Sequence, residues 1–300
     1  MHWILQSNLF KEEAFERLIE TLERFNIPHS QHKVVPFVGT LIPVDGAPGL
    51  DDIDAYADPM LAKLTGPVIC MGSYSMRHSA KKYNWTPGVF DLMEAGSFDN
   101  CMKHWGHVML NADSAVVPFS AASWPAGEKR FIRPTDDSKY FAGKVIEANE
   151  FLDWQRNVCV LKLDYGNSLK PDTLIQVARL KKIYAEYRCW VVKGRIITMS
   201  LYKRGDTVVY QNMDGELGRE ARDFANTVLR SHDGGMDIRM IASNVFGWHP
   251  AEAFCLDVCD TSEGWKVVEV NTLNACGFYA ANLTSLVLAL EQSFNKWFTG

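Results

Sequence analysis

The stretch AFCLDVCDTSEGWKVVEVNT, residues 253–272, carries most of the information on the fold, because it reads as two strands joined by a short polar turn. Side chains alternate between the two faces of a strand, so Glu269 and Asn271 share one face and Val268 lies on the other. A hairpin that turns around DTSEGW places Asp257, on the first strand, directly across from Glu269. The sequence therefore predicts two carboxylates and an amide on one face of a mostly apolar strand pair.

This arrangement is unfavourable unless positive charge lies close by. Two carboxylates roughly 5 Å apart on a half-buried sheet repel each other, and each of them costs free energy when it leaves water. A divalent cation removes both problems. The oxygen ligands that Asp257, Glu269 and Asn271 supply suit Mg²⁺ or Mn²⁺ better than Zn²⁺. On pattern alone, two solvated strand residues without a metal remain an equal alternative.

Composition limits the class of protein. With 300 residues, 47% of them apolar, the chain can bury a large core and is long enough for two domains. A net charge of −5 argues against bulk attraction to nucleic acid. The seven cysteines form no CxxC pair and are odd in number, as in a reducing compartment. No signal peptide and no membrane-spanning apolar run is found, so we expect a soluble, cytoplasmic protein.

The texture of the sequence changes near its middle. Residues 1–118 are expected to form an α/β domain, because HWILQS at 2–7 reads as a strand and apolar residues recur at helical spacing over 15–25. FSAASWPAGEKR, at 119–130, is rich in Ser, Ala, Pro and Gly and marks the boundary. Residues 119–300 then show antiparallel strand pairs, among them YRCWVV and RIITMSLY joined through a tight Lys-Gly turn.

Two further stretches carry charge into this second half. In FIRPTDDSKYFAG, residues 131–143, a strand ending in Arg133 runs into a loop with Lys139, which can offer cationic groups and backbone N–H donors to phosphate. In YAEYRCWVV, Glu186 and Arg188 share one strand face, which holds the arginine on a sheet rather than on a loop. Taken alone, a charged surface turn and a structural Glu–Arg pair are open alternatives.

In this order, these pieces resemble the ATP-grasp superfamily. FIRPTDDSKYFAG, EYRCWVVKGRIITMSLY and WKVVEVNTLNACGFYAAN look most like a divergent clade of phage and bacterial proteins, which also includes the eukaryotic cell-division-cycle protein that helps to assemble translation initiation factor 2. The resemblance covers roughly residues 125–282. It implies an α/β N-terminal domain followed by an α+β ATP-grasp fold, whose subdomains, at about 119–180 and 181–300, clasp ATP between antiparallel sheets.

The resemblance also implies roles for individual residues. Arg133 stands where ATP-grasp enzymes usually place a phosphate-contacting lysine, and Lys139 lies in the phosphate loop. Arg188 would approach the γ-phosphate or an acyl phosphate. The adenine side would be formed by backbone groups of Gln176, Val177 and Ala178. Mg²⁺ or Mn²⁺ would be held by Asp257, Glu269 and Asn271. Contacts to phosphate or acceptor would come from Ser200, Tyr202 and Lys203.

The function implied by the resemblance is an ATP- and Mg²⁺-dependent ligase. Such an enzyme joins a carboxylate to an amine or another nucleophile through an acyl phosphate, and a peptide or protein could be the acceptor. Two other classes stay open: an assembly chaperone or binding module that holds ATP without turnover, and a nucleotidyl or phosphoryl transferase that acts on protein or nucleic acid. No motif names the acceptor, because specificity in such proteins comes from loops and the cleft between domains.

Overall fold

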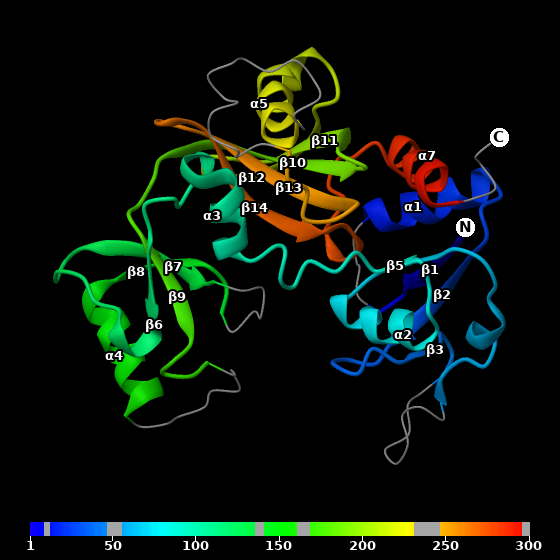
Figure 1. Ribbon diagram of the computed structural model, residues 1–300, viewed down its shortest axis with the longest axis horizontal. Helices are drawn as coiled ribbons and strands as arrows, with labels where there is room; N and C mark the ends of the chain where they lie inside the picture. Colours follow the sequence, from blue (N-terminus) through cyan, green and yellow to red (C-terminus); the bar gives the residue numbers. More distant parts are fainter. Residues whose placement is uncertain (9–12, 47–55, 136–140, 161–168, 231–246, 296–300) are drawn as a thin grey trace.

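The computed structural model describes residues 1–8, 13–46, 56–135, 141–160, 169–230 and 247–295. The strands in these ranges form three sheets, arranged side by side with the five-stranded antiparallel sheet in the middle (Figure 1). None of the helices in the described part of the chain combines the length and the apolar character that a bilayer-spanning segment needs.

The N-terminal sheet is mostly parallel and is covered on both faces. Alternation along its first strand sends Trp3 and Leu5 to one face, against α1 and α7, and Ile4 to the other, against α2. The order is β3-β2-β1-β4-β5. Its elements are β1 (His2–Gln6), α1 (Glu13–Arg24), β2 (His29–Val34), β3 (Leu41–Pro43), β4 (Val68–Met71), α2 (Arg77–Lys82) and β5 (Pro87–Gly88).

The four-stranded sheet, in the order β6-β9-β7-β8, forms a separate lobe with its own small core under one helix. Phe119, Ile132 and Phe151 are buried in that core. The chain reaches this lobe through α3 (Phe98–Trp105) and the segment after it. The elements of the lobe are β6 (Ala115–Pro118), β7 (Lys129–Pro134), β8 (Lys144–Glu147), α4 (Ala148–Cys159) and β9 (Leu174–Ala178).

The central sheet, in the order β12-β11-β10-β13-β14, is antiparallel throughout. Lys193 and Gly194 join β10 to β11 with φ angles of 48° and 71°, the left-handed conformations that a tight two-residue hairpin requires, so the predicted turn is confirmed. The elements are β10 (Ile183–Val192), β11 (Arg195–Arg204), β12 (Thr207–Asn212), α5 (Arg219–Leu229), β13 (Ala253–Thr261), β14 (Gly264–Thr272) and α7 (Leu283–Phe294).

One face of β10 changes character along its length, and this change positions the site. Trp190 and Val192 are buried in the core that the central sheet shares with α1 and α7. Glu186 and Arg188 lie on the same face, because they are four and two residues before Trp190. At that end of the strand the face turns from apolar core to polar side chains that line a cavity or pair with one another.

A buried amide joins the N-terminal sheet to the end of β14. Asn274, in the short 3₁₀ helix Leu273–Ala275, donates from Nδ2 to the carbonyl oxygens of Cys70 and Gly88. Its Oδ1 accepts from the backbone N–H of Phe90. Because these partners lie on or beside β4 and β5, the N-terminal sheet is fixed to the strand that carries Glu269 and Asn271.

Candidate functional site

The register of three neighbouring strands puts the charged residues in a row. Asp257 on β13 pairs with Glu269 on β14, which confirms the hairpin predicted from the sequence. On its other side Asp257 pairs with Arg188 on β10. Arg188, Asp257 and Glu269 therefore lie side by side across the central sheet, and Asn271 follows two residues after Glu269 on the same strand.

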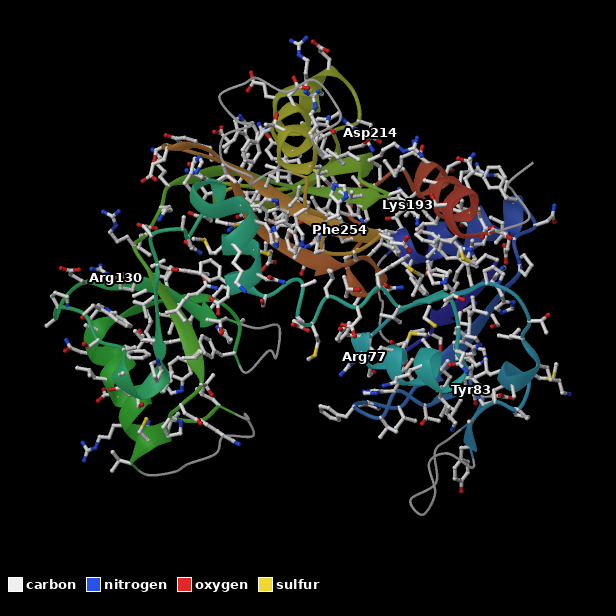
Figure 2. The ribbon with its side chains drawn as sticks, viewed as in Figure 1. Arg77, Tyr83, Arg130, Lys193, Asp214 and Phe254 are labelled. Carbon is white, nitrogen blue, oxygen red and sulfur yellow. The ribbon has the colours of Figure 1, made fainter. Side chains whose placement is uncertain are left out.

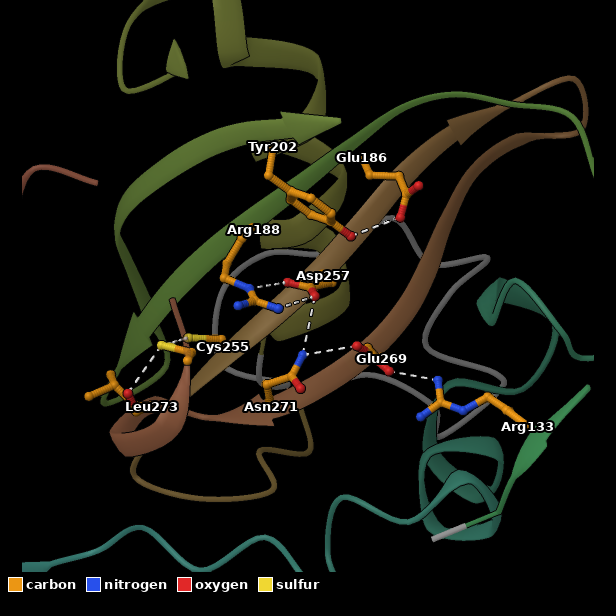
Figure 3. A network of polar contacts seen from close by, with 10 residues as sticks. Arg133, Glu186, Arg188, Tyr202, Cys255, Asp257, Glu269, Asn271 and Leu273 are labelled. Atoms are coloured by element: carbon orange, nitrogen blue, oxygen red, sulfur yellow. Dashed lines mark hydrogen bonds and ion pairs between the residues drawn. The ribbon is translucent and has the colours of Figure 1, made fainter. Parts of the chain in front are cut away.

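The row is held by an unbroken chain of polar contacts (Figure 3). Arg188 donates from Nε and Nη2 to the two oxygens of Asp257, at 2.8 and 2.7 Å. The amide of Asn271 donates to Asp257 Oδ2 and to Glu269 Oε1, at 3.2 Å each. Arg133, which comes from β7 of the other lobe, donates to Glu269 Oε2 at 2.6 Å. The three predicted metal ligands and two predicted phosphate-binding arginines thus form one cluster.

The two carboxylates feel opposite net effects on their pKa. Burial raises the pKa of Asp257, although the Arg188 guanidinium opposes the rise. Burial also works against ionisation of Glu269, but Arg133 and the Asn271 amide outweigh it and hold the pKa of Glu269 below its ordinary value. One bidentate arginine therefore does not fully compensate the burial of Asp257, and more positive charge beside it would be stabilising.

The donor set fits a hard cation. Two carboxylates and an amide oxygen from adjacent strand positions are the kind of ligands that Mg²⁺ or Mn²⁺ accepts, with phosphate and water completing the shell. Asn271 would have to turn its amide, because its nitrogen now faces both carboxylates. Within the described residues, no group of three His, Cys, Asp or Glu side chains gathers as a metal site, so a softer, His- or Cys-rich centre is not indicated there.

Two adjoining cavities lead to this cluster from between the lobes. The first, of about 440 Å³, is bordered by the β7–β8 pair and by the connection between β9 and β10. The second, of about 610 Å³, ends at Glu269 and Asn271. Both are lined by Phe131, Arg133, Gly143, Glu186 and Val268. Together they form a path of the size usual for small-molecule sites, apolar near the connection and charged at its end.

Val268 reaches these cavities because β14 carries a bulge. The ladder shifts between Asp257 and Val258, so that Val258 pairs with Val267. Val267 is fully buried in the core beneath α5, and Val268 lines the cavities. The expectation that Val268 lies opposite Glu269, away from the site, was therefore wrong. Strict alternation cannot anticipate the extra residue.

The residues predicted for the adenine side lie inside a strand. Gln176, Val177 and Ala178 belong to β9, which pairs with β6 on one side and β7 on the other, so their backbone groups lie within two ladders. Gln176 is cross-strand from Arg133, and its Oε1, buried and without a partner among the described residues, lines a cavity of about 30 Å³ beside Arg133. Val177 and Ala178 are absent from the lining of both larger cavities.

The connection after β9 borders the larger path instead. Arg179, Leu180 and Lys181 line the first cavity, together with Ile183 at the start of β10. The sequence analysis missed these residues by a few positions. The missed signal was the change from the apolar strand LIQVA to the basic stretch RLKK, which marks where the chain crosses between lobes.

The phosphate loop is seen only in part. Lys139 lies outside the described residues. Phe141, Ala142 and Gly143 are described and line the second cavity. A Cβ on Gly143 would come within 2.8 Å of the Phe131 ring, so the loop can lie against β7 only because this residue has no side chain.

Glu186 holds a position in the site that the sequence did not reveal. It does not pair with Arg188; its Oε2 accepts from the Tyr202 hydroxyl at 2.8 Å, and its Oε1 lies 3.0 Å from Lys203 Nζ. It lines both cavities. Ser200, by contrast, accepts from the backbone of Ala280 and is absent from the cavity lining. Tyr202 and Lys203 are thus brought to the path and Ser200 is not.

An aromatic group covers the far side of Arg188. The Tyr279 ring lies 5.0 Å from the Arg188 guanidinium and stacks between Tyr202, at 5.3 Å, and Tyr210, at 5.0 Å. Tyr279 has a φ of 47°, a left-handed conformation that is uncommon for a tyrosine. This group was not anticipated either, because it joins three segments that are distant in the sequence.

Comparison with known proteins supports the interpretation of the fold. A family described as an ATP-grasp domain, the third family of its clade, matches residues 103–290. A comparison with curated proteins gave no match. A D-cycloserine synthetase is similar in structure over 98% of this chain and 100% of its own, with a TM-score of 0.57 at 12% identity.

Two other solved structures give the same picture. A D-alanine–D-alanine ligase from Bacillus anthracis complexed with ATP matches over 99% of this chain and 98% of its own, with a TM-score of 0.56 at 11% identity. A RimK domain ATP-grasp protein from Sphaerobacter thermophilus matches over 100% of both chains, with a TM-score of 0.54 at 11% identity. At these identities the likeness establishes the fold. The chain belongs to this clade family of ATP-grasp domain proteins, and it has the α/β N-terminal domain and α+β ATP-grasp fold expected from its sequence.

Proposed function

We propose that this protein binds ATP with Mg²⁺ or Mn²⁺ between its two antiparallel sheets and uses them to join a carboxylate to an amine or another nucleophile. The observation that carries the proposal is the row of Arg188, Asp257 and Glu269, met by Arg133 from the opposite lobe at the end of a cavity path. Oxygen ligands and guanidinium groups at one point suit a metal-bound polyphosphate.

The path offers a place for each part of the nucleotide. The base would lie beside Leu180 and Ile183, where apolar side chains border the first cavity. Glu186, at the junction of the two cavities, would accept hydrogen bonds from the ribose hydroxyls, as a carboxylate does well. The phosphates would reach Arg133 and the backbone of the loop that contains Lys139 and Gly143.

The metal would be held by Asp257, Glu269 and Asn271. It would bridge phosphate oxygens and reduce their charge, and so make the terminal phosphorus easier to attack. Arg188 and Arg133 would stabilise the negative charge on the transferred phosphoryl group from two sides. Since the sheets hold both guanidinium groups in place before the reaction, little reorganisation would be needed.

The proposed chemistry has two steps. An oxygen of the substrate carboxylate attacks the γ-phosphorus, the bond from that phosphorus to the bridging oxygen breaks, and ADP leaves. The nitrogen of an amine then attacks the acyl carbon of the acyl phosphate, inorganic phosphate leaves, and the nitrogen loses a proton. The work of the protein is to position the reactants and to balance charge.

A product assay tests this proposal. Purified protein is incubated with Mg²⁺, ATP labelled at the γ or the α position, and pools of amino acids and short peptides as carboxylate and amine donors. Release of ADP and phosphate that requires both donors supports a ligase. Tight ATP binding without turnover would instead favour a binding or assembly role, and label on a protein or nucleic acid would favour a transferase.

We also infer that the protein works in the cytoplasm. All seven cysteines are free in the structure, and six of them are buried, which fits a reducing compartment. Fractionation of cells that express the full chain would test this inference.

A further inference from the structure

The charges in the candidate site cancel one another within the protein. Arg133 holds Glu269, Arg188 holds Asp257, and Asn271 donates to both carboxylates. Two positive and two negative side chains thus saturate each other in one cluster. A metal ion needs the carboxylates that the arginines occupy, and a phosphate group needs the arginines that the carboxylates occupy.

Each ligand alone therefore meets a charge of its own sign. A divalent cation at Glu269 would lie close to the Arg133 guanidinium, which donates to that carboxylate at 2.6 Å. A phosphate at Arg133 would lie equally close to the Glu269 carboxylate. Like charges at such distances repel strongly in a partly buried site. When metal and phosphate arrive together, each of them neutralises the group that the other displaces.

The two ion pairs differ in how readily they can open. The side chains of Arg188 and Asp257 are 8% and 1% exposed, so separating them would leave a charge buried without a partner. Arg133 and Glu269 are 28% and 31% exposed, and water can reach both of them. They also come from different lobes, β7 on one side and β14 on the other, so a small relative movement of the lobes separates them (Figure 3).

We propose that the Arg133–Glu269 ion pair is an electrostatic latch, which makes metal and nucleotide bind as a unit. The proposal rests on the proposed function, since it concerns the same site. On binding, Arg133 moves from Glu269 to phosphate oxygens and Glu269 turns to the cation, while Arg188 and Asp257 stay paired. Metal alone and nucleotide alone bind weakly, and each increases the affinity for the other by the same factor.

The test measures Mn²⁺ affinity from the electron paramagnetic resonance signal of the free ion. It is measured with and without a non-hydrolysable ATP analogue, for the full-length protein and three variants. Arg133→Gln removes the latch charge and Arg133→Lys keeps it. Arg130→Gln is the matched control, because Arg130 is on the same strand, is paired with Glu128, and lies on the four-stranded sheet apart from the β13–β14 pair (Figure 2).

We expect the analogue to raise the affinity of the unmodified protein for Mn²⁺ by about tenfold or more. Arg133→Gln should bind Mn²⁺ alone about tenfold more tightly than the unmodified protein, while its affinity for the analogue falls. Arg133→Lys and Arg130→Gln should show no such gain. A merely structural role for Arg133 would not raise metal affinity.

Two results would overturn the proposal in different ways. If Mn²⁺ and the analogue bind together but Arg133→Gln gains no affinity for Mn²⁺ alone, the latch is wrong and the proposed function stands. If neither ligand binds under any condition, the proposed function fails, and the latch fails with it.

Discussion

Removing Arg188 should test whether the buried ion pair holds the central sheet together. Arg188→Met keeps much of the side-chain volume but leaves Asp257 ionised, 1% exposed, and with only the Asn271 amide as a neighbouring side-chain donor among the described residues. A buried pair broken on one side costs about 3–5 kcal/mol, because the remaining charge is desolvated without compensation. We expect a loss of that size in the free energy of unfolding at neutral pH.

The assay is urea denaturation followed by tryptophan fluorescence, with the slope checked for constancy. Arg130→Met is the control, since Arg130 and Glu128 form a pair that is 24% and 44% exposed, and its loss should cost less than about 1 kcal/mol. The double variant Arg188→Met/Asp257→Leu removes both charges and should recover to within about 1 kcal/mol of the unmodified protein. A single variant as mild as the control would contradict this account of the buried pair.

The loss should also depend on pH. Burial already raises the pKa of Asp257, and Arg188 is the group that opposes this rise. Without Arg188, the folded-state pKa of Asp257 moves further above its unfolded value of about 3.9. A carboxylate with a raised folded pKa destabilises the fold increasingly as pH rises above the unfolded pKa. The deficit of Arg188→Met should therefore be largest near pH 7 and shrink towards pH 4.

Three further predictions concern the proposed activity. Glu269→Gln and Asp257→Asn should each lower metal-dependent ATP turnover by about 100-fold or more, because each removes a ligand charge, and circular dichroism should show the fold intact; undiminished turnover in both would exclude the metal assignment. Gly143→Ala should weaken ATP binding in calorimetry, because its Cβ would lie 2.8 Å from the Phe131 ring and the loop would have to shift. Glu186→Gln should weaken binding of ATP more than that of 2′,3′-dideoxy-ATP; equal losses would remove Glu186 from the ribose.

The parts of the site that the sequence predicted are those set by local rules. The Asp257–Glu269 pairing follows from a period of two and a short turn, and both hold over the short span of the hairpin. The tight turn at Lys193-Gly194 follows from the backbone freedom of glycine. In each case the deciding residues are close together in the chain.

The parts that were missed depend on partners from elsewhere. Gln176 was placed beside adenine, but β9 is flanked by β6 and β7, and a strand with neighbours on both sides has few backbone groups left for a ligand. The partners of Glu186 are Tyr202 and Lys203 on the adjacent strand rather than Arg188 two residues away. The Val268 bulge depends on the register between strands. None of these can be obtained from periodicity within a single segment.

The contrast between the two ion pairs shows how one chemistry can serve two ends. Both pairs join an arginine to a carboxylate at 2.6–2.8 Å, so contact geometry does not distinguish them. Burial and connectivity do: Arg188 and Asp257 are neighbours within one sheet and too enclosed to separate, whereas Arg133 and Glu269 are reached by water and bridge two lobes. A pair that must stay closed belongs inside a sheet, and a pair that must exchange partners belongs where two bodies meet.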